Sequence, residues 1–220
     1  MNSASIVKAP WKLNGKGYII LYKFKKDFVL KNGFIPENRK ESFVGGLGAV
    51  MIVDYLSSDA GPYSEILFIP GKFMQRGRKK HMITKIYVST SISVDSGIAN
   101  WAIPKELADF NFISNAEKNK NSEIIRVEKN NVVFFEAQIT SGGLPFPAST
   151  SFIPFPLTQE KPGQLLHTKF KGSGKGKLAK IRSIEVNELF FPDISSQKPL
   201  VAIKIDPFNI RFPEAIVEEV

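Results

Sequence analysis

Lys105 is the residue whose setting could most readily support covalent chemistry. It directly follows Pro104 and lies in a largely apolar run, residues 100–108. A lysine amine attacks a carbonyl only in its neutral form, and apolar burial favours that form over the ammonium. If the side chain faces a pocket, the sequence predicts a nucleophile that forms an imine, or Schiff base. If it faces water, Lys105 is an ordinary surface lysine in the first turn of a helix, since lysine is almost never fully buried.

Several segments of this chain resemble a known family. Residues 97–107 resemble the signature segment of the acetoacetate decarboxylase superfamily, which passes through an aromatic residue to a Pro-Lys pair. Residues 61–65 resemble the family's Tyr-x-Glu piece before a strand. Residues 10–18 resemble a piece in which the family has an arginine before a tyrosine. The matches follow the family's order and extend over residues 10–110, roughly half of the chain.

The resemblance implies roles for particular residues. Lys105 stands where the family has its Schiff-base lysine, and Glu65 where it has a pocket carboxylate that orients the substrate or relays a proton. Lys16 stands where the family has an arginine that holds a substrate carboxylate. Tyr63 and Trp101 complete the implied substrate-binding set. The alternatives are a solvent-facing strand position for Glu65 and a turn position for Lys16, which has glycine on both sides.

The implied activity is that of a lyase, of the decarboxylase or the aldolase/dehydratase type, acting on a small keto acid. The carbonyl condenses with the lysine amine to give an iminium ion, which withdraws electrons so that carbon dioxide or a proton can leave the adjacent carbon. We expect no cofactor and no metal ion, and we expect a homo-oligomer.

Four positions depart from the family's pattern. Glu106 replaces the family's second lysine, and Ile98 and Ala99 stand where it has arginine and glutamate. Val50 lies where the family can have a further pocket carboxylate. A carboxylate beside an ammonium favours the charged form, which is not nucleophilic, although neighbours in sequence can point apart. A different keto acid, an aldol or dehydration reaction, or a lost activity therefore stay open.

Two other classes of function are compatible with the sequence. The 18 phenylalanines suggest an apolar cavity, so the chain could be a non-enzymatic module that binds a small hydrophobic ligand. The net charge of +9 is concentrated in residues 72–85 and 169–182, which contain no acid, so an electropositive surface could bind acidic partners. Nucleic acid is not favoured as a partner, because no aromatic residues interleave with the basic run 76–81.

Composition excludes several other kinds of site. The absence of cysteine rules out disulfides, thiolate catalysis and cysteine-ligated metal. His81 and His167 are the two histidines; neither has an evident carboxylate partner, and we expect both to be surface or packing residues. No apolar segment is long enough to span a bilayer, and the first ten residues do not resemble a secretory signal. We expect a cytoplasmic protein without membrane contact.

Short β-branched and aromatic segments separated by turn residues predict a mostly β, antiparallel fold with few short helices, closed as a cone- or barrel-like sheet in one domain, residues 1–220. Asn130 and Asn131 predict a tight hairpin, because asparagine tolerates positive φ. We expect a loop at residues 140–147 that covers a cavity mouth or a subunit interface. The predicted strands are residues 18–22, 48–56, 64–69, 82–93, 124–128, 132–138, 181–189 and 200–205, the predicted helices 104–110 and 213–220, and the predicted hairpin tip 171–177.

Overall fold

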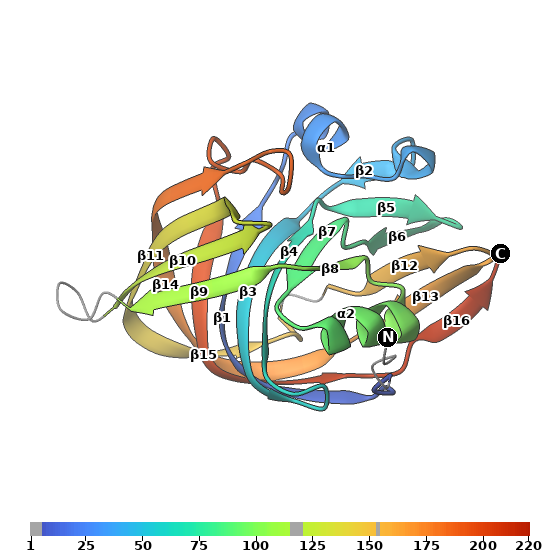
Figure 1. The fold of residues 1–220 in the computed structure, drawn as a ribbon. Helices are drawn as coiled ribbons and strands as arrows, with labels where there is room; N and C mark the ends of the chain where they lie inside the picture. The colour runs from blue at the N-terminus through green and yellow to red at the C-terminus, as the bar shows by residue number, and fades with distance from the viewer. Residues whose placement is uncertain (1–5, 115–120, 153–154) are drawn as a thin grey trace.

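The computed structural model describes residues 6–114, 121–152 and 155–220 (Figure 1). Within these residues most of the chain forms strands, arranged in two sheets. None of the helices there is both long and apolar enough to cross a membrane. The helices are α1 (Lys26–Asn32), the 3-10 helix η1 (Glu37–Arg39) and α2 (Ser91–Trp101).

The larger sheet has ten strands and is almost wholly antiparallel. Its strand order is β8-β7-β4-β3-β1-β15-β14-β11-β10-β9, and the one parallel pair is β7 with β8. The strands are β1 (Trp11–Tyr22), β3 (Gly48–Ser58), β4 (Tyr63–Ile69), β7 (Lys85–Val88), β8 (Lys105–Leu107), β9 (Asp109–Ser114), β10 (Ser122–Lys129), β11 (Val132–Ser149), β14 (Lys171–Val186) and β15 (Val201–Phe212).

The two edges of this sheet are consecutive in sequence. Only Ala108 separates β8, at one edge, from β9, at the other. The Ala108 N–H donates to the carbonyl of Val88 at 3.0 Å, so the junction is held against β7. The sheet must therefore curl until its edges meet at Ala108, as Figure 1 shows. The predicted mostly β, curled antiparallel architecture is confirmed.

The smaller sheet has six strands in the order β16-β13-β12-β6-β5-β2. It lies beside α2 at one side of the curled sheet (Figure 1). Its strands are β2 (Phe43–Gly45), β5 (Lys72–Gln75), β6 (Arg78–His81), β12 (Leu157–Lys161), β13 (Gln164–Thr168) and β16 (Ile216–Glu219).

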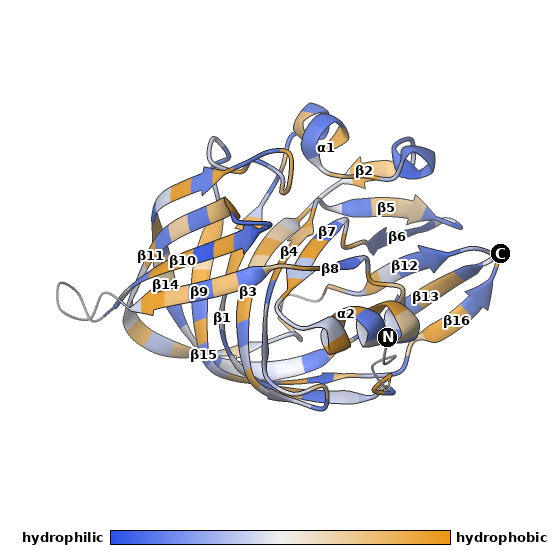
Figure 2. Cartoon of the chain, viewed as in Figure 1, coloured by the Kyte–Doolittle hydropathy of each residue, from blue (hydrophilic) through white to orange (hydrophobic). Residues whose placement is uncertain are grey.

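The central strands of the large sheet are buried on both faces, so two apolar cores form. Along β4, Ile66 and Phe68 enter one core, while Tyr63 and Leu67 enter the other. Residues 66–69 of β4 form an unbroken hydrophobic run, whereas hydrophilic and hydrophobic bands alternate along β10 and β11 (Figure 2). This difference follows the rule that a strand covered on both sides is apolar throughout. The second core, which contains Trp11, Leu67 and Trp101, faces α2 and part of the small sheet.

Several predicted elements are confirmed and others are wrong. The hairpin at Asn130 and Asn131 is present, with φ of 54° and 62°. Residues 91–93, predicted as strand, begin α2 instead. The two predicted helices are also wrong, since residues 105–107 and 109–114 are strands and residues 216–219 form β16.

The predicted loop at residues 140–147 and the predicted hairpin tip at 171–177 are both parts of long paired strands. They belong to β11 and β14, which pair with each other. The glycines of β14 allow close approach and do not mark a turn: a Cβ at Gly176 would lie 2.6 Å from the Phe146 ring. Glycine is required wherever another group approaches the backbone this closely.

Candidate active site

Lys105 is the first residue of β8 and comes shortly after α2. The helix ends at Trp101, and its C-terminal cap, Ala102, adopts the left-handed conformation with φ of 53°. This C-terminal cap turns the chain so that Pro104 and Lys105 leave the helix as extended backbone. Lys105 then pairs with Ile86 of β7 in parallel register. The residue is 6% exposed, so the alternative of a surface lysine in the first turn of a helix is wrong.

The Lys105 amine ends between a carboxylate and a hydroxyl. Its Nζ lies 3.1 Å from Oε2 of Glu65 and donates to Oγ of Ser93 at 3.0 Å. Glu65 is 5% exposed and Ser93 is fully buried. Buried charges in proteins are paired almost without exception, and this pair satisfies both partners.

The backbone of α2 makes room for the lysine side chain. A Cβ at Gly97 would lie 2.6 Å from Cδ of Lys105 and 2.8 Å from its Cε. Ser93 and Gly97 are four residues apart and therefore share one face of the helix. The lysine stem packs on the glycine while its amine reaches the serine one turn away.

Aromatic rings surround the ion pair. The Lys105 Nζ lies 5.0 Å from the Tyr63 ring centroid and 5.8 Å from that of Trp11. The Tyr55 hydroxyl donates to Oε1 of Glu65 at 3.3 Å. Burial, and then the negative charge of Glu65, raise the pKa of both tyrosines well above the ordinary value. Both phenols are therefore neutral near pH 7.

A cavity of about 340 Å³ opens on this ion pair. Glu65 and Lys105 are the charged groups among the described residues that line it. The other walls are mainly apolar and come from both sheets and from the end of α2. They include Trp11, Leu13, Met51, Val53, Leu67, Ile69, Ile83, Ile86, Trp101, Ile103, Phe146, Phe155, Leu157, Phe170, Ile203, Ile205, Phe208, Ile210 and Phe212.

The structure brings four of the five predicted site residues together. Lys105, Glu65, Tyr63 and Trp101 all line the cavity. Trp101 forms part of its wall, with Nε1 donating to the carbonyl of Pro213 at 2.7 Å. Residues 146–148 also line it, so the segment expected at a cavity mouth does contact the cavity, although as strand.

Lys16 lies elsewhere. Its Nζ is 3.6 Å from Oε1 of Glu123 and 4.0 Å from Oδ2 of Asp54. Met51 and Val53, which flank Asp54 on β3, face the cavity. Because side chains alternate along a strand, Asp54 and its partner Lys16 face the other side of the sheet. The expected contact between Lys16 and a substrate at Lys105 is absent from this arrangement.

The Glu106 carboxylate points away from Lys105. It therefore does not contact the lysine amine, as its place next to Lys105 in the sequence had suggested it could. Its carboxylate pairs with Lys85 and, at 2.6 Å, with Lys129. Burial raises the pKa of Glu106, but hydrogen bonds from these two lysines outweigh burial and lower it overall. Ile98 is 48% exposed and Ala99 is also exposed, so neither departure from the family's pattern faces the cavity.

Sequence reasoning missed Tyr55, Ser93, Gly97 and Trp11. Tyr55 pairs directly with Tyr63 across β3 and β4, so strand register would have placed it beside Glu65 once that pairing was known. No local motif marks Ser93, because its role depends on a helix that the sequence did not predict.

The two histidines lie outside this site. His81 is buried and packs on Phe155, with ring centroids 4.7 Å apart. His167 contacts Glu218 through Nε2 and Thr158 through Nδ1, each at 2.8 Å. The prediction that His167 has no carboxylate partner is therefore wrong. In the described part of the chain, no three His, Asp or Glu side chains gather as metal ligands.

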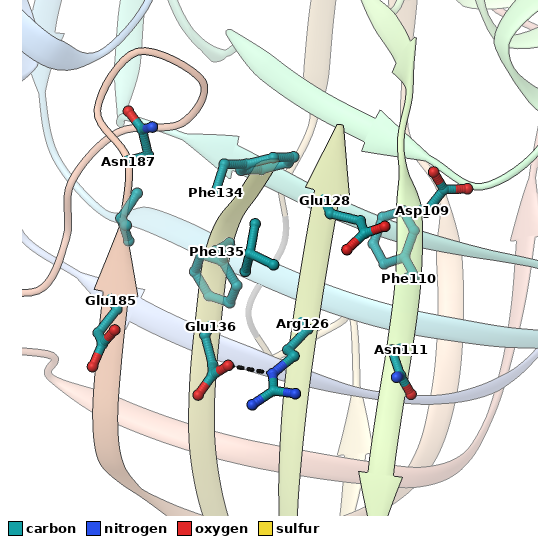
Figure 3. Close-up of a pocket in the computed structure, with 12 residues that line it drawn as sticks. Asp109, Phe110, Asn111, Arg126, Glu128, Phe134, Phe135, Glu136, Glu185 and Asn187 are labelled. Atoms are coloured by element: carbon teal, nitrogen blue, oxygen red, sulfur yellow. Dashed lines mark hydrogen bonds and ion pairs between the residues drawn. The ribbon is translucent and has the colours of Figure 1, made fainter. Parts of the chain in front are cut away.

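A second hollow, of about 780 Å³, lies over β9, β10, β11 and β14 (Figure 3). Its basic side chain, Arg126, points to Glu136, with which it forms an ion pair. Figure 3 also shows Asp109, Glu128 and Glu185 around the hollow. It contains no buried nucleophile, so Lys105 remains the candidate centre of chemistry.

Comparison with known proteins supports the same fold. No family model matches the chain, and no curated protein matches it.

A solved acetoacetate decarboxylase aligns over 97% of this chain and 91% of its own, with a TM-score of 0.75 and 15% identity. The acetoacetate decarboxylase of Legionella pneumophila aligns over 99% and 92%, with a TM-score of 0.73 and 15% identity. The enduracididine biosynthesis enzyme MppR, complexed with pyruvate, aligns over 98% and 93%, with a TM-score of 0.66 and 13% identity. The chain therefore has the acetoacetate decarboxylase fold, as a divergent sequence.

Proposed function

We propose that this chain is a lyase in which the Lys105 amine forms an imine with a carbonyl substrate. The observation that carries the proposal is the position of that amine, which is buried beside an apolar cavity and 3.1 Å from the Glu65 carboxylate. Such a pair is weak evidence for stability, because its desolvation offsets its attraction. A buried lysine and carboxylate in a cleft are instead a common arrangement for catalysis.

Glu65 can carry the proton transfers that imine formation needs. The carboxylate accepts one proton from the Lys105 ammonium, and the neutral amine attacks the carbonyl carbon. The attack leaves an alkoxide, which becomes a hydroxyl group by taking a second proton from the nitrogen. Glu65 returns the first proton to this hydroxyl, which leaves as water and yields an iminium ion beside a restored carboxylate.

The same carboxylate supports the next step. Glu65 can remove a proton from the carbon next to the iminium, which gives a neutral enamine and a neutral carboxylic acid. Charge neutralisation is favourable in an apolar cavity, where an ion pair lacks hydration. The enamine carbon can then form or break a bond to a second carbonyl compound, as in the aldolase/dehydratase type. Decarboxylation of a keto acid is the other route to an enamine, and it requires a place for the substrate's carboxylate.

A non-enzymatic role is the second candidate function. The apolar walls of the cavity favour it, because a hydrophobic ligand could bind there without any covalent step. Under this alternative, ligand-induced thermal stabilisation is independent of the lysine amine. Under the lyase proposal, the amine is essential for turnover.

Reductive trapping tests the lyase proposal. The protein is incubated with cyanoborohydride and a panel of acetoacetate, pyruvate and uncharged ketones, and peptides are mapped by mass spectrometry. We expect an adduct on Lys105. Lys105→Arg keeps a cation beside Glu65 but cannot form an imine, so it should lose the adduct. Lys16→Arg is the matched control and should keep it. Absence of an adduct on Lys105 with every carbonyl compound would contradict the proposal.

The expected cytoplasmic location and homo-oligomeric state are further parts of the proposal. Size-exclusion chromatography with light scattering measures the second of these directly, and a monomer at micromolar concentration would contradict it.

A further inference from the structure

We infer that the substrate of this site is an uncharged ketone or aldehyde with an apolar body, and not a keto acid. The inference rests on the proposed imine chemistry of Lys105, and it concerns which carbonyl compounds the cavity accepts.

The first argument is the balance of charge in the cavity. Lys105 and Glu65 are the charged groups among its described lining residues, and they neutralise each other. After imine formation the iminium keeps the lysine's positive charge, so it still pairs with Glu65. An uncharged substrate preserves this balance. A keto acid adds a second anion, and no second cation lines the described walls to pair with it. Burying an unpaired carboxylate is strongly unfavourable.

The resemblance implies that Lys16 is the cation that binds a substrate's carboxylate. Its amine is on the other face of the sheet, near Asp54 and Glu123. Lys204 also pairs with Glu123, at 3.0 Å. Moving Lys16 into the cavity would require its side chain to cross the sheet, because the strand's alternation fixes the face.

Uncharged donors in the cavity are mostly engaged elsewhere. The Tyr55 hydroxyl donates to Glu65, and Ser93, which accepts a hydrogen bond from Lys105, is not among the residues that line the cavity. The Thr150 hydroxyl donates to the carbonyl of Gly172 at 3.4 Å. These contacts leave few donors that could replace a cation opposite a carboxylate.

The second argument is the apolar lining. The walls carry aromatic rings from several elements, including Trp11, Trp101, Phe155 and Phe208. A volume of about 340 Å³ lies within the range of sites for small organic ligands. The cavity reaches the surface near Phe152, which lines it and is 74% exposed. A three- or four-carbon keto acid would leave most of these walls without contact, whereas an alkyl or aryl chain would cover them.

A matched pair of carbonyl compounds tests the inference. Octan-2-one and 2-oxooctanoate have the same chain length and carbonyl position but differ in charge. Trapping rates on Lys105 are measured with each and divided by the rates with free N-acetyl-lysine, which corrects for intrinsic reactivity. We expect the ketone to exceed the keto acid by about tenfold or more, equivalent to ~1.4 kcal/mol. Equal corrected rates, or faster trapping of the keto acid, would overturn the inference.

Non-covalent binding separates failure of this inference from failure of the proposed function. Loss of trapping with both compounds would contradict imine chemistry but would leave the cavity's preference measurable. Octan-1-ol and octanoate are then compared by thermal shift on the wild-type protein. Greater stabilisation by the alcohol supports an uncharged ligand, and greater stabilisation by octanoate overturns it.

Discussion

At the scale of single residues, Glu65 has two separable effects. As an anion it pairs with the Lys105 amine, and as a base it can remove a substrate proton. Glu65→Gln removes both effects while keeping an oxygen for Tyr55. We expect Glu65→Gln to slow trapping with octan-2-one, because Glu65 no longer carries the protons of imine formation, and to lower deuterium incorporation next to the carbonyl further, by about 10²–10⁴-fold.

Deuterium exchange is followed by proton NMR in heavy water, with the trapping rate measured on the same sample. The two readouts distinguish a base from a merely structural carboxylate. A parallel fall in trapping and exchange would show that Glu65 acts only up to imine formation and does not remove the substrate proton.

His81 gives a pH-dependent contribution to stability that is independent of the cavity chemistry. Burial, and then the positive charge of Lys72, lower its pKa to about 4, against about 6.5 in the unfolded chain. Between these values the unfolded state binds more protons, so the free energy of unfolding rises with pH and falls on acidification. From pH 7 to pH 5 we expect His81 to contribute a loss of ~2 kcal/mol.

Urea unfolding at pH 7, 6 and 5 measures this loss. His81→Leu removes the titrating ring and keeps an apolar contact for Phe155, so its stability should fall less over the same range. An identical fall in the variant would mean that other groups cause the acid sensitivity.

Residue types alone could not settle which charges face the cavity. The sequence drew attention to Lys105, and the resemblance implied that Glu65 lies near it. It could not show that Glu106 faces Lys85 and Lys129, or that Lys16 faces away. Which face a side chain occupies depends on strand register, and the bulge around residues 15–17 of β1 shifts that register.

At the scale of elements, α2 was the main failure of prediction. Amphipathic helices are recognised by apolar residues at helical spacing. The buried positions of α2 are instead Ser93, Ser96, Gly97 and Trp101. Small polar residues allow the helix to lie close to Lys105 and the N-terminal segment, where Ser96 accepts a hydrogen bond from the N–H of Val7. The helix is therefore specified by close packing, which a sequence pattern does not reveal.

Gly97 offers a test of this element's role. Gly97→Ala adds a methyl group 2.6 Å from Cδ of Lys105, so the lysine stem must move. A displacement of about 1 Å can lower a rate by about 10²-fold. Alanine also favours the helix over glycine by about 1 kcal/mol, which opposes the strain of the new contact. We expect trapping to fall by about 10²-fold while urea unfolding changes by ~1 kcal/mol or less.

The matched control is Ala99→Gly, on the exposed side of the same helix. It should lower the free energy of unfolding by about 1 kcal/mol and leave trapping unchanged. If Gly97→Ala reacted at the wild-type rate, the packing of the lysine stem on this glycine would have no part in the chemistry.

At the scale of the whole molecule, the curled antiparallel sheet was predictable and the cavity was not. The strand-like segments and the resemblance both indicated the architecture. The cavity depends on contacts between distant parts of the chain: Trp11 of β1, Phe155 before β12 and Phe208 of β15 all line it. No local pattern encodes such a meeting, because it follows from how the sheets pack.

The Lys105–Glu65 pair lies inside an otherwise apolar core. Its effect on the free energy of unfolding distinguishes a pair that the fold needs from a pair that serves chemistry. Removing one partner of a buried pair typically costs about 3–5 kcal/mol, whereas replacing both with uncharged groups is often neutral. We expect Lys105→Met to lower the free energy of unfolding by ~3 kcal/mol or more. The double variant Lys105→Met/Glu65→Gln should return to within ~1 kcal/mol of the wild type, because no unpaired charge remains.

A double-mutant cycle by urea unfolding at pH 7 measures these values, with Glu65→Gln as the other single variant. Recovery in the double variant would mean that the fold does not need the charges, which leaves chemistry as the reason for a lysine at the cavity. If the double variant instead lost the sum of the two single effects, the pair would be a structural requirement, and the stability argument for a reactive Lys105 would fail.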